Sequence, residues 1–246
     1  MATSDRLTEA HRLQQVRLGA LTTREVLALW RLIDLDDLDA SAEIWVRAVA
    51  RIVAQQRTKS AALARRYLVA HRSSILGASA PAVVGLEVPE LVVPALRSSL
   101  LTVGPYGLRN RVANRGLTVA RASDIAKVEA SRVAMRESLA GGRGLIDRVV
   151  NRDRVVQGVQ RRTASSPCSF CALLASRGAV YKSEETARFS PHSGCGCQPE
   201  PVYRRKQKRT PQAERFYKQY DQAADRAYDE GVSVDVMFRR IREGRA

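Results

Sequence analysis

Apolar residues in the first two-thirds of the chain recur every three or four positions, which is the period of an amphipathic helix. The longest such pattern predicts one helix from Ala40 to Ser73, with apolar positions at Trp45, Val49, Ile52, Leu63 and Tyr67. The acidic link from Asp34 to Asp39 precedes this helix and offers carboxylates that can cap its N-terminus.

Shorter helices are expected on both sides of the long one. Leu21–Leu32 forms a short amphipathic pattern, and Gly77–Pro94 is rich in residues that break helices. A further helix is expected over Glu90–Leu101, ending near Gly104-Pro105. Leu117–Ala140 is again periodic, and the glycines of Gly141-Gly142-Arg-Gly144 are expected to end it.

The pattern changes after residue 162, where Cys, Ser, Pro and Gly are concentrated. Two short strands are expected, at Gly178–Tyr181 and Pro201–Tyr203. Thr210-Pro211 is a favoured helix start, with Thr as N-cap and Pro at the first helical position. That helix is expected to end at Gly231, and a last short helix runs from Ser233 to Arg242. One face of the first of these two helices carries Phe216, Tyr217, Tyr220, Ala224 and Tyr228, which favours packing over base stacking.

These elements predict a mainly α protein. We expect a helical N-terminal domain over residues 1–116 and a small α+β module containing the cysteines over residues 117–203. A basic linker and C-terminal helices are expected over residues 204–246.

Charge is distributed unevenly along the 246 residues, which carry a net charge of +16. Residues 1–50 hold six basic and eight acidic side chains, whereas residues 51–150 and 151–246 have net charges of +10 and +8. Such a surface favours polyanions through counterion release and long-range attraction. An Arg-rich, solvated surface without a nucleic-acid role is the alternative.

The chain shows no secretory signal, and no window approaches the roughly 18–20 apolar residues that span a bilayer. We therefore expect no membrane partner and synthesis in a reducing cytosol. In that compartment, clustered cysteines more often bind metal than form disulfides.

All the cysteines lie in one segment, together with one of the three histidines. The order is C-x2-C, twenty residues, then H-x2-C-x-C, which brings together Cys168, Cys171, His192, Cys195 and Cys197. Paired cysteines at this spacing predict one structural zinc ion with four ligands. The expected set is Cys168, Cys171, His192 and Cys197 with Cys195 as substitute, because side chains in an extended C-x-C diverge.

Other interpretations of the cluster remain open from the sequence. The cysteines could form disulfides after release into an oxidising medium, or remain buried free thiols. Cys168 or Cys171 with His192 also makes a formal nucleophilic pair, and Glu184 and Glu185 lie between the ligand pairs. We assign no catalytic residue, because neither a Gly-x-Ser-x-Gly elbow nor a phosphate loop is present.

Two further groups of residues carry expectations. The histidines His11 and His71 lie in helical segments without a partner motif, so both are expected to be surface or cap residues. The basic run after the module is a candidate nucleic-acid contact, or alternatively a solvated linker: Arg204, Arg205, Lys206, Lys208 and Arg209.

The motif Pro167-Cys-Ser-Phe-Cys171 … Gly178-Ala-Val-Tyr181 … His192-Ser-Gly-Cys-Gly-Cys197 … Pro201-Val-Tyr203 resembles the MuF-like minor head proteins of tailed bacteriophages. The preceding stretch Glu129-Ala-Ser-Arg … Ala134 resembles the helix before the Cys/His module in that family. The resemblance covers about residues 117–203, and the Arg- and Ala-rich composition suits a phage of a high-GC actinobacterial host.

The resemblance implies a head-morphogenesis protein that is made in the host cytoplasm and sits inside the capsid. It implies portal, capsid or scaffold proteins as partners. The basic charge of the chain independently predicts non-specific contact with packaged double-stranded DNA. Some related chains are described as capsid maturation proteases, which is the alternative activity. A free DNA-binding regulator is a third possibility, although H-x2-C-x-C departs from the finger pattern H-x3–5-H.

Overall fold

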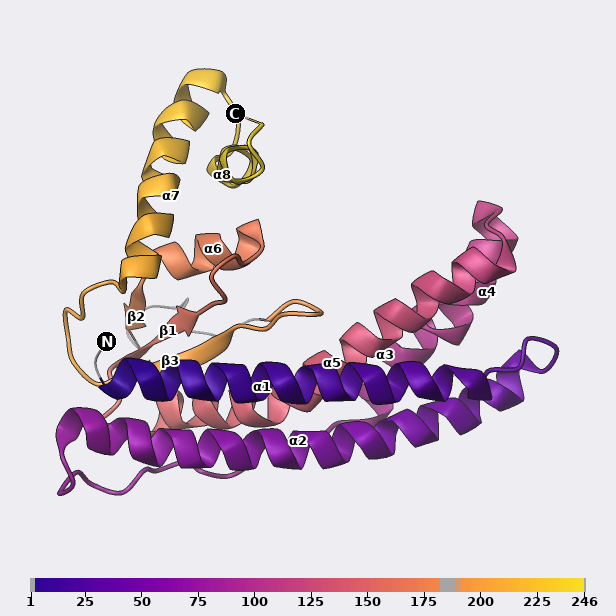
Figure 1. Cartoon of the computed structure of the whole chain (residues 1–246), viewed down its shortest axis with the longest axis horizontal. Helices are drawn as coiled ribbons and strands as arrows, with labels where there is room; N and C mark the ends of the chain where they lie inside the picture. Colours follow the sequence, from indigo (N-terminus) through magenta and orange to yellow (C-terminus); the bar gives the residue numbers. More distant parts are fainter. Residues whose placement is uncertain (1–2, 182–188, 190, 246) are drawn as a thin grey trace.

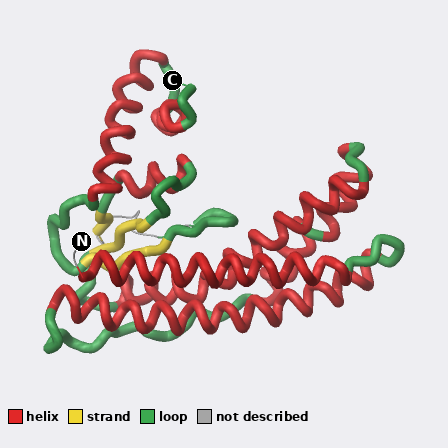
Figure 2. Tube along the Cα trace, viewed as in Figure 1, coloured by secondary structure: helices red, strands yellow, loops and turns green. Residues whose placement is uncertain are grey.

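The computed structural model describes residues 3–181, 189 and 191–245, and the chain is mainly helical. Three long helices form an elongated bundle (Figures 1 and 2): α1 (Thr3–Ala28), α2 (Leu38–Leu76) and α5 (Val119–Arg152). A short 3-10 helix, η1 (Leu29–Leu32), and the acidic link turn the chain from α1 into α2. The predicted fold class is confirmed.

The long second helix is where the hydrophobic pattern places it. The side chain of Asp37 accepts a hydrogen bond from the backbone N–H of Ala40 at 3.4 Å, so the acidic link caps α2 as expected. Gly77 ends the helix with φ 90°, a conformation open to glycine. The segment between Gly77 and α3 contains no regular structure, as its prolines and glycines predict.

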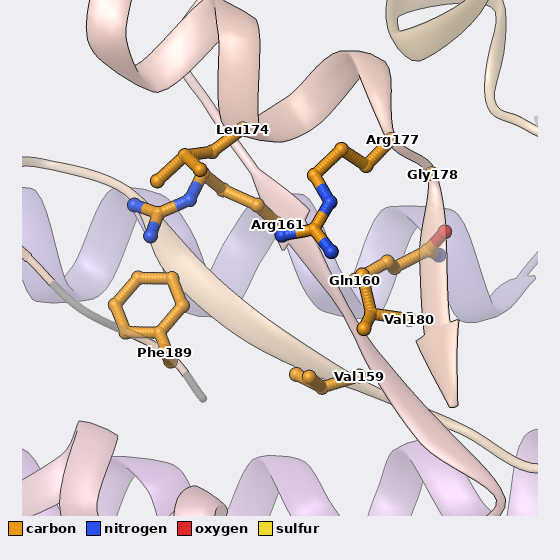
Figure 3. Close-up of a pocket in the computed structure, with 8 residues that line it drawn as sticks. All are labelled: Val159, Gln160, Arg161, Leu174, Arg177, Gly178, Val180 and Phe189. Atoms are coloured by element: carbon orange, nitrogen blue, oxygen red, sulfur yellow. The ribbon is translucent and has the colours of Figure 1, made fainter. Parts of the chain in front are cut away.

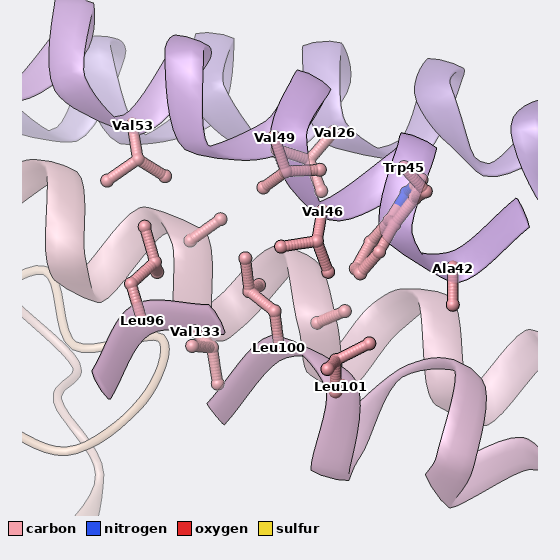
Figure 4. Close-up of a cluster of buried hydrophobic side chains, with 12 residues drawn as sticks. Val26, Ala42, Trp45, Val46, Val49, Val53, Leu96, Leu100, Leu101 and Val133 are labelled. Carbon is pink, nitrogen blue, oxygen red and sulfur yellow. The ribbon is translucent and has the colours of Figure 1, made fainter. Parts of the chain in front are cut away.

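The core at one end of the bundle lies between α2, α5 and α3 (Val93–Val103), as Figure 4 shows. Val49, Leu100 and Val53 are fully buried there. Trp45 packs edge-on against Trp30 of η1, with ring centroids 5.5 Å apart. Burial of each such side chain stabilises the fold by about 1.5–3 kcal/mol, so this end is held by apolar packing.

The predicted end of α5 is wrong, because the helix continues through its glycines to Arg152. Gly141 and Gly142 lie against the backbone of α2. A Cβ atom at Gly141 would lie 2.3 Å from the carbonyl oxygen of Arg57, and one at Gly142 would lie 2.7 Å from that of Ser60. These glycines therefore permit a close helix crossing and do not terminate the helix.

The first helix starts at Thr3, well before the expected Leu21. Its early positions that face the bundle are polar, including Thr8, His11 and Gln15. Gln15 Nε2 donates to the carbonyl oxygen of Ser60 at 3.0 Å, and its Oε1 accepts from Ser60 Oγ at 2.8 Å. Hydrogen bonds replace apolar contacts in this stretch, so a search for apolar periodicity misses it.

A second unexpected helix, α4 (Pro105–Arg115), follows α3 directly. The pair Gly104-Pro105 ends α3 as expected. Pro105 is in addition the first residue of α4, a position that proline favours. In Figure 1, α3, α4 and the start of α5 form an arm at one end of the bundle.

At the other end lies a small antiparallel sheet with strand order β2-β1-β3. The strands are β1 (Gly158–Arg162), β2 (Ala179–Tyr181) and β3 (Gln198–Val202), so both predicted strands are present. Gly158 pairs with Tyr181 on one side and with Val202 on the other. This sheet lies beside the N-terminal half of α1 (Figure 1).

Of the last three helices, α6 (Ser169–Ser176) packs against β1, while α7 (Pro211–Glu230) and α8 (Val234–Arg242) pack against α6 and against each other. Thr210 Oγ1 accepts from the backbone N–H of Ala213 at 3.1 Å, and Gly231 ends α7 in the left-handed conformation, both as predicted. Phe216 and Tyr220 pack in the local core, whereas Tyr228 is 90 % exposed, so the predicted aromatic face is only partly buried.

Within the described residues, no helix is long and apolar enough to cross a membrane. The division of the chain at residues 116 and 203 stays a prediction. The helix α5 follows the predicted boundary at residue 116, but it packs along α1 and α2, which precede that boundary.

Candidate metal centre

The first two thiols of the cluster lie at the start of α6. Cys168 is the N-cap residue of this helix, and its Sγ accepts from the backbone N–H of Cys171 at 3.5 Å. A helix N-terminus favours negative charge, so both positions suit thiolates. Cys168 is exposed and Cys171 is buried, which places one thiol at the rim and one inside.

The remaining candidates lie on the loop that leads into β3. His192, Cys195 and Cys197 precede the first strand residue, Gln198. Gly194 has φ +77° and turns this loop, and the backbone N–H of Cys195 donates to the carbonyl oxygen of His192 at 3.1 Å. The turn directs the loop back toward the start of α6.

The two knuckles bring all the predicted donors together. His192 Nε2 lies 3.2 Å from Cys168 Sγ and 3.3 Å from Cys171 Sγ, and the sulfurs of Cys171 and Cys195 are 3.6 Å apart. The donor atoms of Cys168, Cys171 and His192 lie within 4.8 Å of one another, as do those of Cys171, Cys195 and Cys197. Cys171 is therefore shared by both groups.

The orientation of His192 leaves one nitrogen for an ion. Its Nδ1 lies 2.9 Å from the carbonyl oxygen of Ser193, and a carbonyl can only accept a hydrogen bond. The Nδ1 atom must therefore carry the proton, which leaves the Nε2 lone pair facing the thiols. A histidine fixed through its other nitrogen is the usual arrangement at a metal site.

A buried arginine from the bundle holds the second knuckle. Arg143 of α5 is 3 % exposed, and its guanidinium donates to the carbonyl oxygens of Cys195 and Cys197, the latter at 2.9 and 3.2 Å. Burial lowers the pKa of Arg143, while the thiols of Cys195 and Cys197 oppose that change. Because arginine stays protonated in proteins, a full positive charge lies beside these sulfurs.

No carboxylate in the described part of the chain forms a salt bridge with Arg143. A buried cation is costly unless an anion compensates it. Ionised thiols at Cys195, Cys197 and Cys171 would supply that negative charge.

The crowding of the thiols shifts their acidity in opposite directions. Hydrogen bonds with the Cys171 and Cys197 thiols lower the pKa of Cys195, and Arg143 adds to the decrease. Hydrogen bonds with Cys195 and Cys197 raise the pKa of Cys171. Without an ion, a single negative charge would be stabilised by hydrogen bonds from the neighbouring thiols. A bound cation would instead favour loss of the proton from every thiol that coordinates it.

The donors line an open cavity of about 220 Å³, with Pro167 and Gly196 on its wall. A smaller pocket lies nearby between β1, β2 and α6, where Arg177 and Arg161 extend into the same space (Figure 3). The Arg161 guanidinium lies 4.2 Å from the ring centre of Phe189, and its Nη1 reaches within 3.9 Å of Cys171 Sγ. A second cation therefore flanks the cluster.

The structure thus brings together each of the sequence-predicted donors but does not select four of them. Glu184 and Glu185, considered as an acid or base, lie outside the described residues. Sulfur and imidazole donors in this number suit zinc, and calcium or magnesium would need oxygen ligands.

The basic run 204–209 lies on the loop between β3 and α7. The guanidinium of Arg209 donates to the carbonyl oxygen of Ser176 at 3.0 Å and lies 3.9 Å from the ring centre of Tyr217. Arg205 donates to Gln157 at 3.5 Å. All five cations of the run are exposed, so each remains accessible to the predicted contact.

The expectation for the two helical histidines is wrong, because both are buried. His11 is 2 % exposed and stacks on Tyr67, with ring centroids 4.4 Å apart and nearly parallel planes. His71 Nε2 lies 3.2 Å from a carboxylate oxygen of Glu200 on β3. Burial, with a smaller effect of the neighbouring His71, lowers the pKa of His11 to about 3.

Glu200 is the centre of this missed network. Its carboxylate accepts from Gln160 at 2.8 Å and Arg162 at 2.7 Å, both on β1, and from Thr8 of α1 at 3.3 Å. The network therefore fastens the sheet to α1 and α2. The sequence carried one usable signal: Thr8, His11 and Gln15 share one helical face at spacings of three and four.

A protein-family model described as "VG15 protein" matches residues 109–223. This segment is slightly less than half of the chain and includes all the candidate ligands. The chain is similar to that family over this segment, and the similarity indicates a phage-associated protein. No curated protein and no solved structure matches the chain.

Proposed function

We propose that the chain is a phage minor head protein that acts in head assembly near the portal, with one structural zinc ion in its Cys/His cluster. The observation that carries the proposal is the family match over residues 109–223, which spans α5, the sheet and the complete cluster. The motif resemblance to MuF-like head proteins supports the same role. Portal, capsid or scaffold proteins are the proposed partners, and the interior of the capsid is the proposed location.

The zinc part of the proposal is supported by the donor geometry and by Arg143. The proposed zinc ion would have four ligands, either three cysteines with His192 or all four cysteines. Either set would give the zinc centre a net negative charge, and the cations Arg143 and Arg161 lie beside it. Zinc would join the start of α6 to the loop before β3. Binding at such a site contributes folding free energy on the order of 10 kcal/mol.

We also propose non-specific contact with packaged double-stranded DNA. The net charge of +16 favours it, and Arg204, Lys206 and Lys208 are accessible on the loop between β3 and α7. Contacts of this kind depend on phosphate charge and not on base sequence.

The assembly role is tested by co-expressing the chain with the portal, scaffold and major capsid proteins of the same phage. We expect the chain to copurify with assembled heads, and its omission to lower the yield of portal-containing heads. Heads that form in normal yield without the chain, and that exclude it when it is present, would overturn the proposal.

One observation favours a second candidate, a cysteine protease acting on head proteins. Cys168 is exposed, its Sγ lies 3.2 Å from His192 Nε2, and His192 is oriented by the carbonyl oxygen of Ser193. This is the geometry of a nucleophile with its base. The additional thiols of Cys171, Cys195 and Cys197 instead suit a metal centre.

The same co-expression separates the two candidates. A protease predicts cleavage of a capsid or scaffold protein that disappears in Cys168→Ala while zinc content stays at the wild-type level. The structural role predicts no such cleavage with either chain.

A further inference from the structure

The exposed faces of α1 and α2 carry many cations. Between Ala10 and Ile33 the sequence contains one acidic residue, Glu25, and between Ile44 and Leu86 it contains none. The carboxylate of Glu25 accepts a hydrogen bond from Gln56 at 2.9 Å. Apart from Arg65, which is exposed but donates to the carbonyl oxygen of Leu86 at 2.8 Å, the exposed cations on these helices are seven: Arg6, Arg17, Arg24, Arg47, Arg51, Lys59 and Arg66.

These cations differ from those of the arm in how they are paired. In the arm, Arg97 pairs with Glu43, Arg109 lies 3.3 Å from Asp39, and Arg111 pairs with Glu129. On α1 and α2, the seven cations just named make no salt bridge to any residue of the described ranges. Their charge is therefore uncompensated within that part of the protein.

The charges on α1 are aligned along the helix. Arg6, Arg17 and Arg24 are separated by eleven and seven residues, which are about three and about two helical turns. They therefore lie along one line on the outward face. At 1.5 Å per residue the line is about 27 Å long, most of one turn of a DNA duplex.

Cations on α2 lie at the same levels of the bundle as those on α1. The two helices run antiparallel, and Gln15 donates to the carbonyl oxygen of Ser60 at 3.0 Å. Arg17 follows Gln15 by two residues and Lys59 precedes Ser60 by one, so the two cations lie at the same level of the bundle. Like charges on neighbouring helices repel one another unless solvent or a polyanion compensates them.

We infer that the outward face of α1 and α2, centred on Arg17, Arg24, Arg51 and Lys59, binds the phosphate backbone of duplex DNA. This face, here called the α1–α2 face, would be the main DNA contact, with the 204–209 loop secondary. The inference rests on the DNA part of the proposed function. It is independent of the zinc site.

The composition of the face favours DNA over an acidic protein. In α1, and in α2 from Arg47 onward, the large apolar side chains exposed among the described residues are Leu13 and Val69. A protein interface normally has an apolar centre with charges at its rim. A protein–DNA interface is more polar and more positively charged.

The test measures binding of the full chain to a random duplex of about 30 base pairs, roughly three turns, between about 50 and 200 mM salt. The test variant replaces Arg17, Arg24, Arg51 and Lys59 by Gln. Its matched control removes the same charge from the loop, by replacing Arg204, Arg205, Lys206 and Lys208 by Gln. Gln keeps helix propensity, and circular dichroism verifies the fold of both.

We expect the face variant to lose at least about tenfold in affinity at the higher salt, with a salt slope shallower by about three to four. The loop variant should lose less on both measures. Equal losses would mean that only net charge matters, and an unchanged face variant would mean that DNA binds elsewhere. Either result overturns the inference.

Two further outcomes are informative. If the wild-type chain fails to bind the duplex even at low salt, the proposed DNA contact itself is wrong. If polyglutamate of similar charge displaces the duplex and binds the face more tightly, the surface serves an acidic protein and the DNA inference is overturned.

Discussion

The α1–α2–α5 bundle and the cysteine/histidine cluster beside the sheet are held together in different ways. In the bundle, long helices bury Val49, Val53 and Leu100 and approach closely at Gly141. At the cluster, polar and thiol side chains converge from the start of α6 and from the loop before β3. The bundle thus rests on packing that the chain supplies alone, while the cluster as we propose it depends on a bound ion. Changes in the two regions should therefore be separable.

The largest expected effect is at Cys171, the thiol common to both donor groups. Cys171→Ser should remove most of the metal-linked stability, which is on the order of 10 kcal/mol. Cys195→Ser should cost much less, because Cys195 is the substitute in the expected ligand set and Cys197 already binds. Chemical unfolding of both variants in the presence of excess zinc measures the difference, and equal losses would show that no ligand is spare.

In the bundle, the largest effect is expected at the helix crossing. A methyl group at Gly141 would meet the carbonyl oxygen of Arg57 at 2.3 Å, and backbone cannot move aside cheaply. Gly141→Ala should lower the free energy of unfolding by about 3 kcal/mol while zinc stoichiometry stays unchanged. Thermal unfolding and metal content measure the two effects. A variant as stable as wild type would contradict the close crossing.

The buried His11 gives the bundle a pH dependence of its own. Its pKa is lowered from 6.5 to about 3, so the unfolded chain binds a proton below pH 6.5 that the folded chain refuses. The stability contributed by neutral His11 is full above about pH 6.5 and falls as the pH falls toward 3. At pH 5 the loss is about 2 kcal/mol.

His11→Phe keeps a ring to stack on Tyr67 and removes this titration. The difference in unfolding free energy between wild type and His11→Phe should therefore change by about 2 kcal/mol from pH 7 to pH 5. Because both chains share the zinc site, its own acid sensitivity cancels in the difference. Parallel pH profiles would mean that His11 is protonated in the folded state.

The smallest effect is expected at the cap of α7, which lies outside both regions. Thr210→Ala removes the hydrogen bond from the Ala213 backbone N–H and should cost about 1 kcal/mol. Thermal unfolding measures the loss, and Thr210→Ser, which keeps the hydroxyl, is the matched control. A loss at Thr210→Ala with no rescue in Thr210→Ser would point to packing of the methyl group.

The contrast also explains which features the sequence could predict. Local signals were sufficient for the cap at Asp37, the start of α7 at Thr210 and the cluster spacing, since each depends on residues close in sequence. The early turns of α1 face the bundle with polar side chains, among them Gln15 and Thr8, that form hydrogen bonds with α2 and β3. Apolar periodicity carries no information about such partners.

Glycine and histidine were misinterpreted for a related reason. Gly141 and Gly142 are helix-ending residues in isolation, and only the backbone of α2 shows why the helix continues. His11 stacks on Tyr67 of the next helix, and His71 contacts Tyr67 one turn earlier on its own helix and Glu200 far along the chain, so burial of both histidines depends on distant partners. Arg143 likewise belongs to the metal centre only through the fold.

The claim that one zinc ion organises the cluster is tested most directly by elemental analysis of the purified full-length chain. We expect one zinc per wild-type chain, less than half of that in Cys171→Ser, and wild-type content in Gly141→Ala. A folded wild-type chain without metal, whose thermal stability does not change when zinc is added, would contradict it.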